Sequence, residues 1–390
     1  MRVIVYAHLM EIGGSQLCAV DLAGRTAEHG HEVTLFAPPG DLVALARSRG
    51  LRVVHPPDPG RWPTRRNVRE LVALVRETRA DVVHGYEWGP AAEVILGPFL
   101  ATGTPGVATC LSMDVPDFMP TSLPLIVGTH DLYCEQCARR GDVHLMEPPI
   151  DTRRHAPSDP AIARTILGLG SDDVVVSVVG RLTTDLGKLS GVLEAIDAVG
   201  QVGRHYRVVL LVVGDGPGLG ATRTAAAVVN RSLGREAVRV VGSLIDPDPA
   251  YAAADIVLGM GSSALKGMAH GRPLVVQGEG GFWRLFDEGS APSFRRNGWW
   301  GQGGAGTSDL VTILHTVIAD PARRAWLGSI GRDLVLTHYD LERATDQVIT
   351  LYDRVLAPTR RQRIAAAARM GADMIAFKAA LARHRRGDRP

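Results

Sequence analysis

Short runs of aliphatic and β-branched residues alternate with amphipathic stretches along the first part of the chain. Each run is apolar and is bounded by turn residues, which is typical of a strand buried on both faces of a parallel sheet. The runs lie at residues 3–6, 32–36, 52–55, 81–84, 105–110, 124–128 and 144–147. Because strands that alternate with helices imply βαβ units, this pattern predicts a Rossmann-like α/β domain over residues 1–150.

A second series of apolar runs follows a proline-rich segment. Pro148, Pro149, Pro157 and Pro160 cluster among charged residues, as is typical of an interdomain linker. The runs of the second series lie at residues 173–180, 207–214, 238–242, 255–259 and 273–278. They predict a second Rossmann-like domain over residues 158–340.

Helical patterns occupy the C-terminal part, residues 341–390. An amphipathic helix is predicted over residues 338–356, and a basic, alanine-rich helix over residues 359–390. A basic helix can lie on an anionic membrane surface. Its apolar face lacks Trp and is interrupted by charge, so docking on the protein with a solvated basic face is the favoured interpretation. The glycine-rich residues 289–306 give no prediction.

Composition narrows the functional classes. The chain has 390 residues, of which 45% are hydrophobic and 22% charged, which is typical of a globular protein of two domains. A formal net charge of +2 gives no general attraction to nucleic acid. No apolar run reaches the roughly 18–20 residues of a membrane-spanning helix. The N-terminus is predicted to be a first strand instead of a signal peptide, which favours a cytoplasmic location. The oligomeric state is left open.

The cysteines predict neither a metal site nor a redox centre. Cys134 and Cys137 form a CxxC pair near His130, but zinc sites usually need a second such pair. The surrounding pattern is not that of a thioredoxin-like unit. Two small buried thiols on a helix are the favoured interpretation.

Two turns at the ends of predicted strands carry residues suited to an anionic ligand. In the segment GGSQ, residues 13–16, the glycines allow close approach to the backbone and the helix start offers N–H groups. A simple tight turn explains this segment equally well. Arg181 follows a later strand and Lys188 opens the next helix, and this pair of cations suits a diphosphate. Solvated surface charges are the alternative.

A third turn lies within LGMGSSALKGMAHG, residues 258–271. Gly259 and Gly261 shape the turn, and Ser262 or Ser263 is predicted to cap a helix whose free N–H groups accept phosphate. Residues 214–217, GDGP, form a similar strand-to-helix turn. Open α/β sheets bind ligands at the carboxyl ends of their strands, so we expect a site at this edge.

The order and spacing of these segments resemble the family-four retaining glycosyltransferases of the GT-B fold. The resemblance covers residues 2–356 and is closer in the second domain. It rests on GGSQ, DVVHGYEW (81–88), GRL with a downstream Lys, GDGP (214–217), VRVVGSLID (238–246), YAAADIVLGMGSSALKGMAHGRPLVV (251–276) and GEGG (278–281). The resemblance implies two Rossmann-like domains facing each other across a cleft, with the first helix of the C-terminal part crossing back to the N-terminal domain.

The resemblance also implies a chemistry, in which a nucleotide-diphosphate sugar is the donor and no cofactor or metal takes part. Arg181 and Lys188 would bind the diphosphate and stabilise the charge on the departing nucleotide. Gly13 and Gly14 would face the donor diphosphate from across the cleft. The backbone around Ser243 and Leu244 would contact the nucleobase, and Ser262, Ser263 and Leu265 would hold the phosphates. In this mechanism the leaving phosphate can take the proton of the acceptor.

Several positions depart from the family pattern. Leu258 and Lys266 stand where two donor-loop Glu residues would be. Lys266 stays a donor-binding candidate because its ammonium could reach a phosphate, and we expect an altered donor mode or a bound acidic group beside it. Lys188 follows Arg181 at a longer spacing than is usual in the family. Residues 105–114 lack the His that relatives place facing the sugar. Other catalytic candidates lie at the same strand ends of the first domain, here called the rim, and each can also be explained as a capping or loop residue: His84, Glu87, Asp114 and Asp117.

The leading hypothesis is a retaining glycosyltransferase that acts on a small or lipid-linked acceptor. The Arg- and Ala-rich composition is typical of a high-GC bacterium, which favours natural-product or envelope glycosylation. One alternative is a nucleotide-sugar epimerase or hydrolase. Another is a pseudo-enzyme that binds a nucleotide or a partner protein, which the replaced carboxylates would suit.

Overall fold

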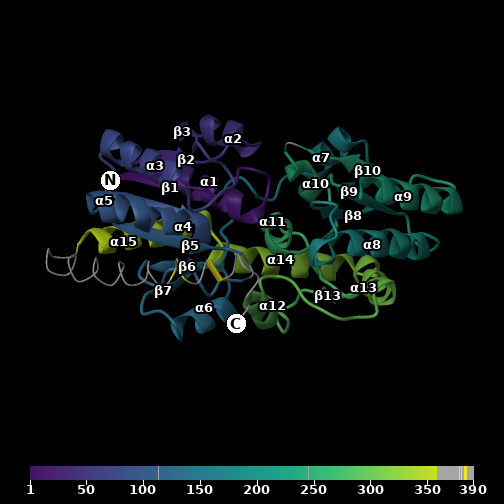
Figure 1. Cartoon of the computed structure of the whole chain (residues 1–390). Helices are drawn as coiled ribbons and strands as arrows, with labels where there is room; N and C mark the ends of the chain where they lie inside the picture. The colour runs from purple at the N-terminus through teal and green to yellow at the C-terminus, as the bar shows by residue number, and fades with distance from the viewer. Residues whose placement is uncertain (113, 245, 358–376, 378, 380–381, 384–390) are drawn as a thin grey trace. The chain divides into compact units, whose positions relative to one another are not determined.

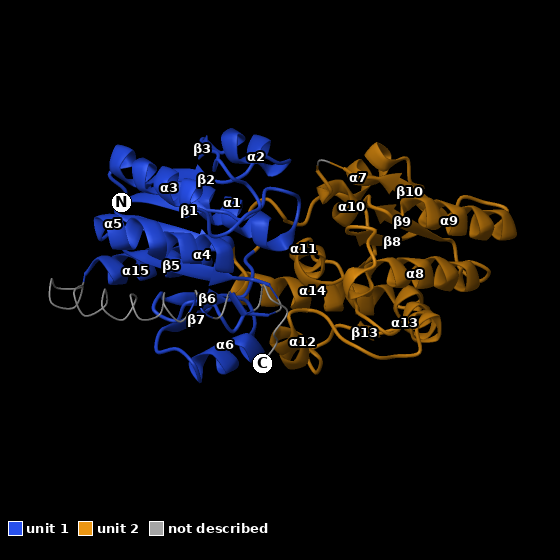
Figure 2. Cartoon of the chain, viewed as in Figure 1, with its two compact units in different colours: residues 1–149, 341–390 blue, residues 150–340 orange. Residues whose placement is uncertain are grey.

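The computed structural model describes residues 1–112, 114–244 and 246–357, together with residues 377, 379 and 382–383. The chain divides into two compact units, one formed by residues 1–149 with 341–390 and the other by residues 150–340 (Figure 2). Each unit is an α/β domain built on a mainly parallel sheet, as the two series of apolar runs predict.

The first unit contains a seven-stranded sheet in the order β3-β2-β1-β4-β5-β6-β7. All neighbouring strands are parallel, and each coincides with one of the seven predicted runs. The strands are β1 (Arg2–Tyr6), β2 (Glu32–Phe36), β3 (Arg52–Val54), β4 (Val82–Tyr86), β5 (Gly106–Cys110), β6 (Leu125–Val127) and β7 (Val143–Leu145).

Helices cover this sheet (Figure 1). They are α1 (Gly14–Glu28), α2 (Leu42–Ser48), α3 (Arg65–Thr78), α4 (Trp88–Val94), the π-helical turn η1 (Ile95–Phe99), α5 (Leu100–Thr102), α6 (His130–Cys137) and α15 (Leu341–Leu356). Helix α15 belongs to this unit although it follows the second unit in sequence. It packs against α1, where Arg25 pairs with Glu342 at 3.3 Å.

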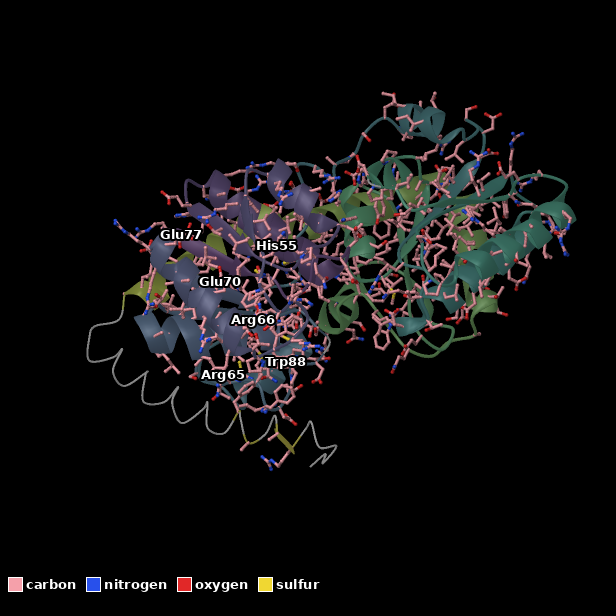
Figure 3. The ribbon with its side chains drawn as sticks, turned by 45° about the horizontal axis from the view of Figure 1, so that its top comes forward. His55, Arg65, Arg66, Glu70, Glu77 and Trp88 are labelled. Carbon is pink, nitrogen blue, oxygen red and sulfur yellow. The ribbon has the colours of Figure 1, made fainter. Side chains whose placement is uncertain are left out.

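Helix α3 illustrates the amphipathic pattern. Leu71 and Val75 are buried against the sheet. Its solvent face carries charged side chains, which Figure 3 labels: Arg65, Arg66, Glu70 and Glu77. The helix begins where the Thr64 hydroxyl accepts the Asn67 amide at 3.1 Å, an N-cap bond that satisfies one first-turn donor.

The second unit contains a six-stranded sheet in the order β10-β9-β8-β11-β12-β13. Five parallel strands coincide with the predicted runs, and β13 is an antiparallel edge strand that the sequence did not predict. The strands are β8 (Val174–Val179), β9 (Val208–Val213), β10 (Val238–Gly242), β11 (Ile256–Gly259), β12 (Leu274–Gln277) and β13 (Trp283–Leu285).

The helical segments of the second unit are α7 (Pro160–Leu167), the 3₁₀ turn η2 (Asp185–Gly187), α8 (Lys188–Val202), α9 (Leu219–Leu233), α10 (Asp248–Ala252), α11 (Gly261–Ala269), α12 (Ala291–Asn297), α13 (Thr307–Ala319) and α14 (Pro321–His338). The glycine-rich segment 289–306 holds α12 and then Trp299. The Trp299 indole is buried and donates to the Tyr339 hydroxyl at 2.8 Å, so this segment is anchored in the core.

The predicted basic helix over residues 359–390 lies outside the described residues, apart from Phe377, Ala379, Ala382 and Arg383. Among the residues that are described, no helix combines the length and the apolar character needed to cross a membrane.

Candidate functional site

A cavity lies at the carboxyl ends of β8, β11 and β12 in the second unit. Its lining includes residues from two of the predicted turns, those after β8 and β11, and from the end of β12: Gly180, Arg181, Lys188, Gly259, Met260 and Gln277. Strand β8 ends at Val179 and β11 at Gly259, so these residues follow directly from the strand ends. The location is the ligand-binding edge that parallel α/β sheets generally use.

The two predicted cations share this cavity but differ in their surroundings. Within the described part of the chain, the exposed Arg181 side chain makes no hydrogen bond or ion pair. Lys188 is half-buried, and its ammonium donates to Asp185. Burial pushes the pKa of Asp185 upward, but the hydrogen bond from Lys188 and the charges of Lys188 and Arg181 outweigh it and set the pKa to about 2. Arg181 is therefore the cation with an unused fork of donors.

The turn that carries Arg181 is held by the GDGP turn. The Leu182 amide donates to the Asp215 carbonyl at 2.8 Å, and the Gly180 amide donates to the Val213 carbonyl at 3.0 Å. A Cβ atom on Gly214 would lie 1.8 Å from the Gly180 carbonyl oxygen. Only glycine fits there, so this turn serves to position Arg181.

Gln277, at the end of β12, positions Lys188. Its side chain is 3% exposed, and Nε2 donates to the carbonyls of Gly187 at 2.9 Å and Lys188 at 3.1 Å. Gly187 has a φ of +70°, which glycine adopts without strain. Sequence analysis missed Gln277, because one glutamine after an apolar run forms no motif and its partners lie about 90 residues earlier in the chain.

Replacing Gln277 by alanine should therefore weaken both the fold and the site. Two buried carbonyls would lose their donor, which costs about 1–3 kcal/mol of unfolding free energy, and the start of α8 would lose its anchor. We expect lower stability in urea denaturation and weaker nucleotide binding by calorimetry. Gln201→Ala, on the exposed far end of α8, is the matched control and should change neither. Equal effects of the two substitutions would contradict this role.

Leu258 does not face the cavity. It lies inside β11 between β8 and β12, and its side chain is 0% exposed in the core. The Leu258 side chain is therefore turned into the core and is not among the residues that line the cavity. Only Met260 separates β11 from α11, so the loop between them is very short.

The start of α11 offers fewer donors than the sequence suggested. Neither Ser262 nor Ser263 caps the helix, because Met260 is the N-cap and no side-chain cap bond forms. The Ser263 hydroxyl instead donates to the Val179 carbonyl at 2.7 Å. Most first-turn amides are already bonded, those of Gly261, Ser263 and Ala264 to backbone carbonyls. Among the described residues this leaves the Ser262 amide as the first-turn donor without a backbone acceptor.

The other predicted donor-side residues are dispersed. The Leu265 side chain is 1% exposed in the core, so only its backbone can meet a ligand. Lys266 is half-buried. Ser243 is exposed, and Leu244 lines a separate apolar hollow with Ile166 of α7.

In the first unit, Glu87 accepts hydrogen bonds from two loops at the ends of the strands. Glu87 follows β4, is 6% exposed and has a φ of +69°, a rare value for a residue other than glycine. The Ser15 hydroxyl donates to Oε1 at 3.0 Å, the Leu111 amide to Oε1 at 3.1 Å and the Ser112 hydroxyl to Oε2 at 2.8 Å. The carboxylate therefore ties the GGSQ turn to the end of β5. Such a strained backbone is typical of functional sites.

His84 is a core residue and not a surface base. It is 0% exposed, Nδ1 is 2.8 Å from the Tyr352 hydroxyl and Nε2 is 2.7 Å from the Thr109 hydroxyl. Burial lowers its pKa to about 3. The prediction that His84 is a catalytic candidate is therefore wrong, because its ring is fully buried and cannot reach a substrate. Asp114 is exposed, and Asp117 pairs with Arg139 at 2.6 Å.

The CxxC cysteines also differ from expectation. Cys134 and Cys137 lie on α6 as free thiols, but both are exposed instead of buried. The pair lies on the solvent face of a short helix.

Comparison with known proteins agrees with this geometry. Residues 12–143 match the family model Glycosyltransferase Family 4, and residues 173–320 match Glycosyl transferases group 1. These findings support a GT-B glycosyltransferase. The two matched segments contain the rim around Glu87 and the cavity with Arg181, respectively.

Solved structures show the same fold. HepE from Anabaena, in complex with UDP, has a TM-score of 0.70 at 18% identity and covers 91% of this chain and 100% of its own. A glycosyltransferase from Rickettsia africae has a TM-score of 0.71 at 14% identity, covering 92% and 99%. Sucrose-phosphate synthase from Thermosynechococcus elongatus has a TM-score of 0.68 at 18% identity, covering 92% and 100%. The fold is GT-B, with two Rossmann-like domains as predicted.

A curated relative gives a more limited likeness. The D-inositol 3-phosphate glycosyltransferase of Kribbella flavida is 27% identical over 218 residues, which are 51% of this chain and 48% of the relative. This chain thus spans about half the length of the curated relative it matches.

Proposed function

We propose that this GT-B glycosyltransferase is a retaining enzyme that uses a nucleotide-diphosphate sugar without a metal. The observation that carries the proposal is the cavity at the ends of β8 and β11, which is lined by Lys188 and by Arg181, a residue with no hydrogen bond or ion pair among the described residues. A guanidinium fork with free donors suits a diphosphate, whose charge grows as the sugar departs. The proposed acceptor is a small natural product or an envelope component, and the proposed location is the cytoplasm.

The roles of the other donor-side groups follow from their positions. The Ser262 amide at the start of α11 would donate to a phosphate oxygen, aided by the helix dipole. The family resemblance implies that the backbone at Gly13 and Gly14 also contacts the donor, and Glu87 holds that turn through Ser15. The leaving phosphate would take the acceptor proton, so the chemistry asks for no separate protein base.

A pseudo-enzyme that binds a nucleotide without turnover is the second candidate. It is favoured by Leu258, which faces the core, and by Lys266, which carries the opposite charge to the expected Glu. The unpaired Arg181 favours a working donor site instead. An epimerase or hydrolase is less well supported, because it would need a carboxylate or imidazole to move protons, and the lining residues of the donor cavity include neither.

Calorimetric titration with UDP, GDP, ADP and dTDP tests the proposal. UDP comes first because HepE was solved in complex with it. We expect micromolar binding of one nucleotide with no divalent ion added to the buffer. Sugar transfer is then tested with the matching donors and a panel of acceptors, with the anomeric configuration read by NMR. Binding without transfer or hydrolysis would favour the pseudo-enzyme, an inverted product would refute retention, and no binding would refute the donor site.

A further inference from the structure

A cluster of metal-ligating side chains lies in the second unit, apart from the donor cavity's lining residues. It contains His155, Asp248 and His270, each offering one ligand atom within 4.8 Å of the other two. His155 Nδ1 lies 2.7 Å from Asp248 Oδ1, and His270 Nε2 lies 3.8 Å from the same oxygen. Both imidazoles are buried, at 5% and 3% exposure. These three side chains thus surround one point in the interior.

His270 gives a second, independent indication. Neither of its ring nitrogens has a hydrogen-bond partner among the described residues, although both nitrogen atoms are buried. Leaving such groups unpaired costs free energy, and buried polar groups normally have partners. Tyr251 stacks on the ring at 5.6 Å and fixes its plane, so Nε2 stays directed at Asp248. A bound ion would satisfy this nitrogen.

We propose that His155, Asp248 and His270 bind one divalent transition-metal ion of the zinc class. Imidazole nitrogen and a carboxylate oxygen are a ligand set that zinc prefers over magnesium or calcium, whose sites are built from oxygen. Three protein ligands would leave a fourth position for water. The ion is not part of the proposed transfer chemistry, which uses Arg181 and Lys188.

Asp248 supplies the negative charge of the cluster. Asp248 Oδ2 accepts from Arg154 Nε at 3.2 Å, which orients the carboxylate so that Oδ1 faces the two imidazoles. The ion would displace the proton of the hydrogen bond between Oδ1 and His155 Nδ1. Arg154 also pairs with Asp246 at 3.0 Å, so its charge is matched by a second carboxylate.

The ion would join three segments that are separate in sequence. His155 lies in the segment before α7, Asp248 is the first residue of α10, and His270 directly follows α11. Helix α11 carries the Ser262 amide and Lys266 at the proposed donor site. The ion would therefore fix the C-terminal end of the helix whose N-terminal end meets the phosphates.

Cobalt titration of the full-length, untagged protein tests the proposal. The protein is stripped with EDTA and carries Cys134→Ser and Cys137→Ser, because the exposed thiols would otherwise bind metal. We expect one equivalent of Co²⁺ to bind with the intense visible bands of a four-coordinate ion, and Zn²⁺ to displace it. His155→Gln and His270→Gln should each lower affinity at least tenfold. His205→Gln is the control, because the His205 ring also lies near another histidine ring, that of His315, with 6.0 Å between the ring centroids.

X-ray absorption of the zinc-loaded protein makes the test independent of whether a variant folds. Two imidazole ligands and no sulfur would support the site. No saturable uptake, a ligand set without two imidazoles, or equal affinity in folded His270→Gln and His205→Gln would overturn it. Because nucleotide binding is measured separately, loss of the metal site would leave the proposed transferase function standing.

Discussion

Arg181→Ala is expected to lower the rate of sugar transfer by about 10²- to 10³-fold, the usual loss when one donor to a developing negative charge is removed. The reason lies in the two cations of the cavity. Lys188 already pairs with Asp185, so part of its field is cancelled before a ligand arrives. Among the described residues Arg181 makes no such ion pair, so its guanidinium donors are available to the leaving diphosphate. Arg181 should therefore matter more than Lys188.

The measurement is initial rates with the nucleotide sugar identified by calorimetry, together with nucleotide affinity. Lys188→Ala should cost less than Arg181→Ala, because Asp185 already offsets part of the Lys188 charge. Arg231→Ala, an exposed arginine at the far end of α9, controls for general loss of charge and should behave as wild type. A wild-type rate in Arg181→Ala would place the donor diphosphate elsewhere.

The sequence predicted the strands well because continuous apolar runs in a parallel sheet are a local signal. Strand β13 was missed because Trp283, Arg284 and Leu285 form a short antiparallel edge with no such run. The position of Arg181 and Lys188 at the edge of the sheet could be predicted for the same reason, because the ends of strands are recognisable from the apolar runs that precede them.

The roles of several site residues could not be predicted from the sequence, because they depend on the direction of each side chain and on partners far away in the chain. Leu258 occupies a predicted motif position, yet the strand extends through it and turns it into the core. His84 looked like a rim residue, but Tyr352, 268 residues later in the chain, closes over it. Ser263 had a capping pattern and instead bonds Val179. Each outcome was decided by tertiary packing that a single sequence does not encode in a readable pattern.

A buried carboxyl in the first unit makes stability depend on pH. Glu93 of α4 is 0% exposed and accepts the Tyr6 hydroxyl at 2.7 Å and the Thr64 amide at 2.8 Å. Burial raises its pKa from 4.5 to about 7, although the hydrogen bonds from Thr64 and Tyr6 oppose the rise. The folded protein thus holds this proton more tightly than the unfolded chain. Its contribution to stability is complete below pH 4.5 and is lost as the pH rises through 7.

Glu93→Gln should remove this dependence, because the amide keeps a neutral group of similar shape and does not titrate. Relative to wild type, the variant should gain about 2–3 kcal/mol of unfolding free energy between pH 5 and pH 8, or roughly 5 °C in Tm. The comparison is between proteins at each pH, because burial of His84 acts in the opposite direction in acid. Glu70→Gln, on the exposed face of α3 (Figure 3), is the control and should follow wild type at every pH. If the difference in unfolding free energy between Glu93→Gln and wild type stays constant across this range, the prediction is wrong. Glu93 would then be ionised throughout, stabilised by its hydrogen bonds from Thr64, Asn67 and Tyr6.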